Sequence, residues 1–172
     1  GNMPEDIKEI ITTIGAYILK LADKGDNLEE NKLKILENIK NGKAYNKFLE
    51  LVQNQNGDIE YVKNTDKFEK AKYILPVICQ EDGYVEKLNA GEVGKISVDL
   101  GAGRLRKEDD IDKAVGIVLN KKNADKVKKG DILAFVYANN KQKGETAVEE
   151  MQNAYTIVEE PVKKEKYILG II

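Results

Sequence analysis

The sequence of 172 residues contains no histidine and no tryptophan, and its single cysteine is Cys79. The absence of histidine excludes Ser-His and Cys-His nucleophile pairs, and it removes the commonest general base and the usual zinc ligand. One cysteine cannot form an internal disulfide. Because Cys79 lies in an apolar run, we expect it to be buried and chemically inert. The chain therefore lacks the side chains on which much hydrolytic and zinc-dependent catalysis depends.

Excess charge and long apolar runs are also missing. The net charge of −2 and the pI near 5.5 give no bulk attraction to nucleic acid or to an anionic membrane, so we expect neither as a partner. No stretch approaches the roughly 18 apolar residues of a membrane span, and no signal peptide is visible, so we expect a cytoplasmic protein. The length allows one domain or two small ones. The chain begins at Gly1 rather than at methionine, which we interpret as the sign of a fragment.

Arginine is scarce, and the only two, Arg104 and Arg106, lie two residues apart. A guanidinium pairs bidentately with carboxylate or phosphate, which lysine cannot reproduce. We name residues 101–112 the arginine loop; its candidate site residues are Gly101, Gly103, Arg104, Arg106 and Lys107. Because acidic residues follow at 108–112, the simpler interpretation is a loop whose arginines are paired within it. The sharper interpretation is a loop that meets another surface or an anion.

Hydrophobic periodicity predicts three helices within residues 1–53. We expect the first to begin near Pro4, the second to be capped by Asn27 with Glu30 in a capping-box arrangement, and the third to be shorter. Residues 54–58 form a polar break. Residues 59–71 are predicted to be a linker with one or two helical turns after Asp66.

From residue 72 onward the pattern predicts a mixture of strands and helices. Pro76 confines the first strand to an edge or a bend. Asn89 and Glu92 predict a helix that ends at Gly101 in a left-handed conformation, although the alternation of apolar residues over 96–100 also permits a strand. The expected strands are 73–79, 84–88, 115–119 (buried), 132–138, 155–158 and 166–172, and a further helix is expected at 145–154.

Three short motifs in this segment resemble known kinds of site. Gly101-Ala102-Gly103 is a weak match to a phosphate loop, because it follows a helix instead of opening one. The acidic residues around Asp110 lack the glycine and the final glutamate of a calcium loop, so we expect no metal site. Asp112-Lys113-Ala114 resembles the hairpin of lipoyl domains, which makes Lys113 a candidate attachment site for a lipoyl or biotinyl-like carrier.

An ordered set of motifs resembles the C-terminal part of pyrimidine-nucleoside phosphorylase and thymidine phosphorylase. From the later half it comprises Asp82-Gly83-Tyr84-Val85, Leu100-Gly101-Ala102-Gly103-Arg104, Lys107-Glu108-Asp109, Ile111-Asp112, Val115-Gly116-Ile117-Val118-Leu119 and Asp125-x-Val127-x-x-Gly130. From the earlier half it comprises Gly1-Asn2-x-Pro4-Glu5-Asp6, Gly15-Ala16-Tyr17, Gly42-Lys43-Ala44 and Phe48. Met3 and Ala124 stand where the family commonly has glycine, and Ala124 would raise the energy of a turn with positive φ.

The resemblance implies an α+β fold, in which residues 1–58 are a helical segment of the parent enzyme's central domain. Residues 59–71 are then the linker, and residues 72–172 a hammerhead-type module with a barrel-sandwich part. It implies a parent enzyme that is a pentosyltransferase, cleaving a pyrimidine nucleoside with phosphate to give the base and a pentose 1-phosphate. Family members are homodimers whose domains close over a cleft.

The family's phosphate-binding, base-contacting and potassium-holding residues lie upstream of Gly1. We therefore expect no catalytic, substrate-binding or metal-binding residue and no cofactor in this chain, and an inactive fragment whose first partner is the N-terminal half of its own polypeptide. The residues that would separate uridine from thymidine are upstream as well.

Overall fold

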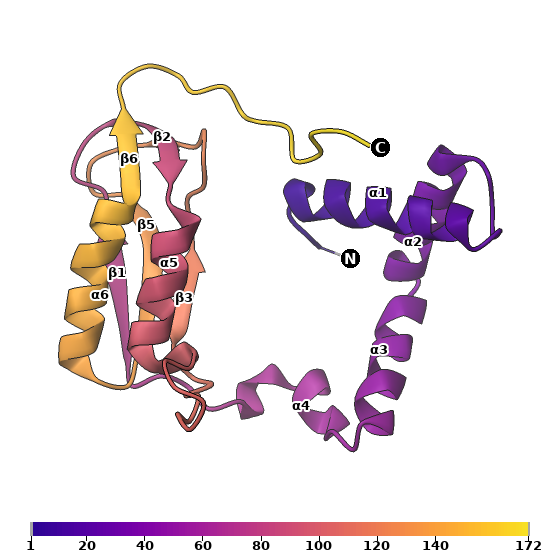
Figure 1. Ribbon diagram of the computed structural model, residues 1–172, viewed down its shortest axis with the longest axis horizontal. Helices are drawn as coiled ribbons and strands as arrows, with labels where there is room; N and C mark the ends of the chain where they lie inside the picture. The colour runs from indigo at the N-terminus through magenta and orange to yellow at the C-terminus, as the bar shows by residue number, and fades with distance from the viewer. Residues whose placement is uncertain (1, 172) are drawn as a thin grey trace. The chain divides into compact units, whose positions relative to one another are not determined.

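A computed structural model describes residues 2–171, which fall into two compact units (Figure 1). The helical unit is Gly1–Thr65 with Glu165–Ile172, and the mixed unit is Asp66–Lys164. No helix among the described residues is long and apolar enough to cross a bilayer. Helices and antiparallel strands are both present, which confirms the α+β class, while the hammerhead and barrel-sandwich arrangement stays a prediction.

The helical unit contains α1 (Glu5–Leu21), α2 (Leu28–Lys40), α3 (Lys43–Asn54) and the short α4 (Ile59–Lys63). The three predicted helices are confirmed, and Pro4 is the N-cap residue of α1. The capping arrangement of α2 is confirmed too, because the Asn27 side chain accepts hydrogen bonds from the Glu29 and Glu30 amides. The segment predicted as a linker thus holds α4 and a 3-10 turn at Thr65–Lys67.

Close packing of α1 on α2 depends on two residues. A Cβ on Gly15 would lie 3.0 Å from the Ile35 side chain, so the small residue lets the helices approach. Asn31 of α2 is fully buried, and its Nδ2 donates to the carbonyls of Ala16 at 3.2 Å and Gly25 at 2.8 Å. These bonds join α2 both to α1 and to the turn between the helices.

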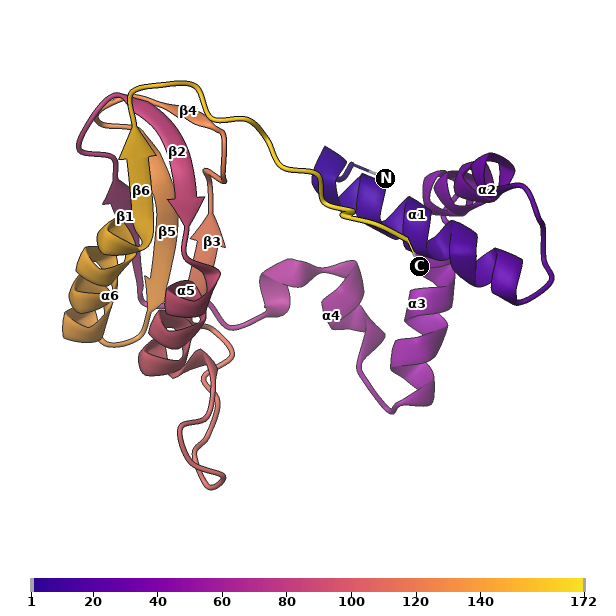
Figure 2. The same ribbon diagram turned by 45° about the horizontal axis from the view of Figure 1, so that its top comes forward.

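The mixed unit contains two three-stranded antiparallel sheets and two helices (Figure 2). One sheet has the order β1-β5-β3 and the other the order β4-β2-β6. The bounds are β1 (Tyr73–Ile78), β2 (Gly83–Leu88), α5 (Ala90–Ser97), β3 (Gly116–Leu119), β4 (Lys126–Val127), β5 (Ile132–Ala138), α6 (Lys141–Ala154) and β6 (Tyr155–Val158). Helix α6 packs on β1 and β5, and α5 packs beside α6.

The core of the mixed unit lies between its helices and its strands. Cys79 is buried within this core, as predicted. Its members come from both sheets and both helices: Val77, Cys79, Val85, Ile96, Leu100, Val115, Val127, Leu133, Ala134, Val136, Ala138, Ala147, Met151 and Tyr155. The unit therefore has an apolar interior made entirely of its own residues.

The helix predicted after Asn89 is confirmed, and residues 96–100 belong to it and not to a strand. The structure corrects three details of the other predicted elements. Strand β3 is an edge strand with an exposed Val118, so the strand predicted at 115–119 is not buried. Helix α6 begins at Lys141, because the Asn140 side chain caps it by accepting from the Lys143 amide. The described residues of the predicted strand 166–172 form no strand, since no other strand of the described chain lies beside them.

Candidate functional site

The arginine loop leaves helix α5 at a defined point. The Asn89 side chain caps α5 by accepting from the Glu92 amide, and the helix continues into a wider turn over Val98–Ala102. Gly101 then takes φ of 113°, the left-handed conformation predicted for it. Gly103 must be small for a separate reason, because a Cβ there would lie 2.7 Å from Val98.

The two ends of the loop are tied together at its base. The Asp112 amide donates to the Gly101 carbonyl at 2.9 Å, which closes residues 101–112 into a loop of the Ω type. The Asp112 carboxylate accepts from the Ala114 amide at 3.0 Å and from Asn139 Nδ2 at 2.7 Å. Asn139 in turn accepts from the Lys72 amide at 2.9 Å. The base is therefore anchored to the segment between β5 and α6 and to the entry of β1.

A second carboxylate holds the tip of the loop. Asp109 Oδ2 accepts from the Leu105 amide at 3.1 Å and from the Arg106 amide at 2.7 Å. The Asp109 amide donates back to the Arg106 carbonyl at 3.1 Å. The carboxylate of Asp109 thus accepts hydrogen bonds from backbone amides and none from an arginine guanidinium.

The basic side chains of the loop take no part in these bonds. Arg104, Arg106 and Lys107 are exposed, and none of their three side chains forms an ion pair or a hydrogen bond with any residue in the described range 2–171. The interpretation that the loop pairs its own arginines is wrong for this chain. Two guanidinium groups and one ammonium are instead presented on a loop whose backbone is fixed at its base and at its tip.

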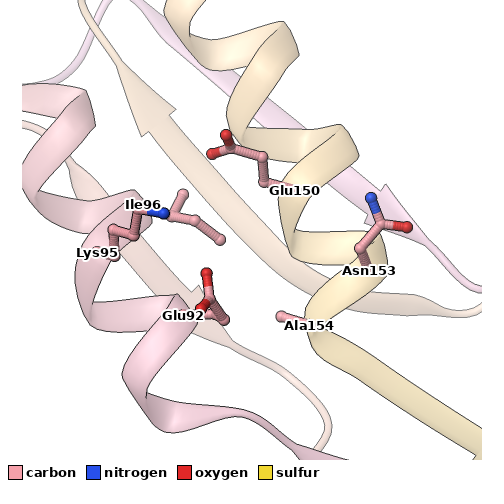
Figure 3. A pocket seen from close by; sticks show the side chains of 6 residues that line it. All are labelled: Glu92, Lys95, Ile96, Glu150, Asn153 and Ala154. Atoms are coloured by element: carbon pink, nitrogen blue, oxygen red, sulfur yellow. The ribbon is translucent and has the colours of Figure 1, made fainter.

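A groove between α5 and α6 adjoins the loop. Its larger part, about 520 Å³, is lined by Leu105 of the loop, Leu100, Lys143 and other residues of the two helices. Its smaller part, about 220 Å³, is shown in Figure 3, where Glu92 of α5 and Glu150 of α6 border the space from the two helices and the Ile96 side chain lies between them. The lining of this part thus combines two carboxylates with the ammonium group of Lys95.

Lys113 is exposed in a turn just before β3, and the arginine loop precedes it. A lipoyl lysine lies at the tip of a hairpin between two regular strands. The structure places a strand on the downstream side of Lys113 alone.

No group of three or more metal-ligating side chains gathers anywhere in the described range. Burial of Tyr155, followed by the charge of Asp125, raises the pKa of its hydroxyl to about 12. The Tyr155 hydroxyl donates to the backbone carbonyls of Lys121 at 3.0 Å and Leu133 at 3.1 Å. These hydrogen bonds hold Tyr155 in the core of the mixed unit.

Sequence reasoning found the loop but missed Asn139, which joins its base to β1. The only local signal was the pair Asn139-Asn140, of which one caps α6. The side chain of Asn139 donates a hydrogen bond to Asp112, which is 27 residues away in the sequence. No local sequence pattern predicts a bond of this kind.

Residues 84–158 match a family model described as the pyrimidine nucleoside phosphorylase C-terminal domain. This segment runs from β2 to the end of β6 and includes the arginine loop and the groove. The mixed unit thus belongs to the class of C-terminal domains found in pyrimidine nucleoside phosphorylases.

Full-length relatives extend the match over most of the chain. It is 45% identical over 139 residues to a pyrimidine-nucleoside phosphorylase of Bacillus subtilis (strain 168), covering 81% of this chain and 32% of that protein. It is 38% identical over 162 residues to a pyrimidine-nucleoside phosphorylase of Staphylococcus aureus (strain USA300), covering 94% of this chain and 37% of that protein. The chain belongs to the pyrimidine-nucleoside phosphorylase family as its C-terminal portion, which confirms the resemblance. It spans about a third of the length of these relatives.

Proposed function

We propose that this chain is the C-terminal part of an enzyme that cleaves pyrimidine nucleosides with phosphate, releasing the base and a pentose 1-phosphate. The observation that carries the proposal is the alignment of 81–94% of the chain with phosphorylases of which it spans about a third. In this proposal phosphate is a co-substrate, any potassium ion is held upstream, and the whole enzyme is a homodimer that works in the cytoplasm.

The chain's own role in this proposal is structural. The mixed unit carries an exposed, tethered loop and an open groove. In this proposal the catalytic residues lie in the N-terminal portion, as the family resemblance implies. The arginine loop docks against that portion and stabilises the closed cleft, because its unpaired guanidinium groups are free to take carboxylate or phosphate partners.

The proposed activity is tested by joining this chain to the N-terminal two thirds of the Bacillus subtilis relative and assaying phosphate-dependent release of uracil from uridine. We expect activity from the joined protein and none from the 172-residue chain or the N-terminal portion alone. Activity from the 172-residue chain alone would contradict the assignment of the catalytic residues to the N-terminal portion. A folded, dimeric joined protein without activity would contradict the proposed function.

The role of the loop is tested in the same joined protein with Arg104→Lys. Because an ammonium cannot make a bidentate contact, we expect kcat/KM for the nucleoside to fall by roughly threefold to tenfold with little change in Tm. Lys87→Arg, at an exposed site on β2, is the matched control and should leave kcat/KM unchanged. Equal values for Arg104→Lys and the unchanged protein would contradict a docking role.

The carrier function stays a second candidate because Lys113 is exposed. Its test is the intact mass of the chain purified from its own cells. A lipoyl-sized increment that disappears with Lys113→Arg would favour the carrier function over the structural role.

A further inference from the structure

The helical unit has almost no interior of its own. Ala16 is the one apolar residue that is buried among the described residues of this unit, beside the polar Thr12 and Asn31. Many large apolar residues of the same unit are exposed instead: Ile7, Ile11, Ile14, Ile18, Leu21, Leu33, Tyr45, Phe48, Leu51, Tyr61, Tyr167, Leu169 and Ile171. A soluble unit with this balance is normally covered by another part of its polypeptide or by a partner.

The exposed residues of α1 form one continuous stripe. Ile7, Ile11, Ile14, Ile18 and Leu21 fall within about 80° of one another around the helix, and they are 41–84% exposed. Thr12 and Ala16, which are buried toward α2, lie on the opposite side of the helix. The stripe therefore remains uncovered even though α1 is already packed against a neighbour.

The C-terminal tail of the chain shows a second uncovered apolar feature in the same unit. Residues 165–171 group with the helical unit, and both views draw the end of the tail near α1 (Figures 1 and 2). Leu169 is 92% and Ile171 60% exposed. Within the described chain, residues 168–171 form no hydrogen bond. The alternation of Tyr167, Leu169 and Ile171 is that of a strand, and it lacks a neighbouring strand.

We propose that the N-terminal portion of the same polypeptide supplies a β-sheet that covers both features. The tail at 166–171 joins this sheet as a strand, and the apolar stripe of α1 lies over its face. This inference rests on the proposed function, since this chain spans about a third of its relatives and about two thirds of their length lies outside it. The stripe carries no charged residue, which suits a permanent interface within one chain better than a transient one.

A second copy of this chain is the rival occupant, and the structure argues against it. Two tails could pair with each other, but each tail offers only six described residues from 166 to 171. An isolated two-stranded pairing of that length is marginally stable in water. A preformed sheet offers the tail a rigid edge and offers α1 a wide apolar face.

The test compares amide hydrogen exchange in the 172-residue chain with that in the joined protein described above. We expect amides 168–171 to exchange at unprotected rates in the chain alone and to be protected at least a hundredfold in the joined protein. The N-terminal portion added in trans is a second format of the same measurement. Absence of protection in both formats would overturn the proposal, as would equal protection in a chain that is dimeric by light scattering.

A pair of variants tests the α1 stripe separately from the tail. Ile18 is 58% exposed in this chain, and in the proposal the sheet covers it in the joined protein. Ile18→Lys should therefore lower the Tm of the joined protein by several degrees and leave that of the 172-residue chain unchanged. Val118→Lys on β3, where exposure is similar, is the matched control and should affect both proteins alike. Equal effects of Ile18→Lys on both proteins would contradict the covering of the stripe. Uridine cleavage is read in parallel, so an active enzyme with an unprotected tail would refute this inference alone.

Discussion

At the scale of single residues, Ala124 bears a conformational cost that the sequence predicted. In the structure its φ is 69°, in the left-handed region that favours glycine. Its amide donates to the Val85 carbonyl at 2.8 Å, so the turn is held by β2 in spite of the strain. A side chain with a Cβ raises the energy of this conformation by about 1 kcal/mol.

Ala124→Gly should therefore raise the free energy of unfolding of the mixed unit by about 1 kcal/mol, less the added entropy of the unfolded chain. Urea denaturation of the 172-residue chain measures the change. Ala90→Gly, in the first turn of α5, is the control and should lower the stability. A loss of stability with Ala124→Gly would mean that the left-handed turn does not persist in solution.

Tyr155 gives a prediction about pH. Burial raises its pKa to about 12, whereas the pKa of an unfolded tyrosine is about 10. Above pH 10 the unfolded chain releases the phenolic proton while the folded chain retains it. The stabilisation by Tyr155 is thus complete below pH 10 and is lost as the pH rises to 12, at about 1.4 kcal/mol for each pH unit.

The unfolding free energy of the unchanged chain should fall more steeply between pH 10 and pH 12 than that of Tyr155→Phe. Lysine deprotonation affects both proteins equally, so the difference in slope isolates the tyrosine. Parallel curves would show that the Tyr155 hydroxyl is not buried in solution.

At the scale of elements, the close packing of α6 on β1 and β5 depends on Gly144. A Cβ at this position would lie 2.8 Å from Leu75 of β1 and 2.9 Å from Ala138 of β5. Gly94 of α5 is the opposite case, since a Cβ there would meet nothing within 4 Å. One helical glycine is required by packing and the other is not.

Gly144→Ala should destabilise the mixed unit by roughly 1–3 kcal/mol, although alanine favours the helix. Gly94→Ala should stabilise it by up to about 1 kcal/mol. Thermal unfolding of the two variants side by side separates the packing effect from helix propensity. Similar shifts for both would show that α6 does not lie close to β1 and β5.

At the scale of the whole molecule, the two units differ in how far they can fold alone. The mixed unit has an interior made of its own side chains, whereas the helical unit buries little apolar surface. Residues 66–164 expressed alone should therefore unfold cooperatively, with a Tm within a few degrees of the same unit in the longer chain. Residues 1–65 alone should show little cooperativity. A molten fragment 66–164, judged by poorly dispersed amide signals, would contradict this division.

Sequence reasoning predicted the local features well because neighbouring residues cause them. Asn27 and Asn89 cap helices by bonds to amides two or three residues away, and Gly101 ends the α5 turn through its own φ. The same reasoning was wrong about the arginines. Their possible partners are close in sequence, but Asp109 and Asp112 are taken by backbone amides and by Asn139.

The sequence by itself determined the family, the helix caps, the edge position of the strand with Pro76 and the burial of Cys79. Only the tertiary structure decided which segments with strand-like patterns become strands, because a strand exists through a neighbour that lies elsewhere in the chain. Residues 155–158 find β2 and become β6, whereas residues 166–171 have an apolar pattern and find no partner within the described chain. The closure of the arginine loop was decided in the same way, by the long-range bond between Asp112 and Asn139.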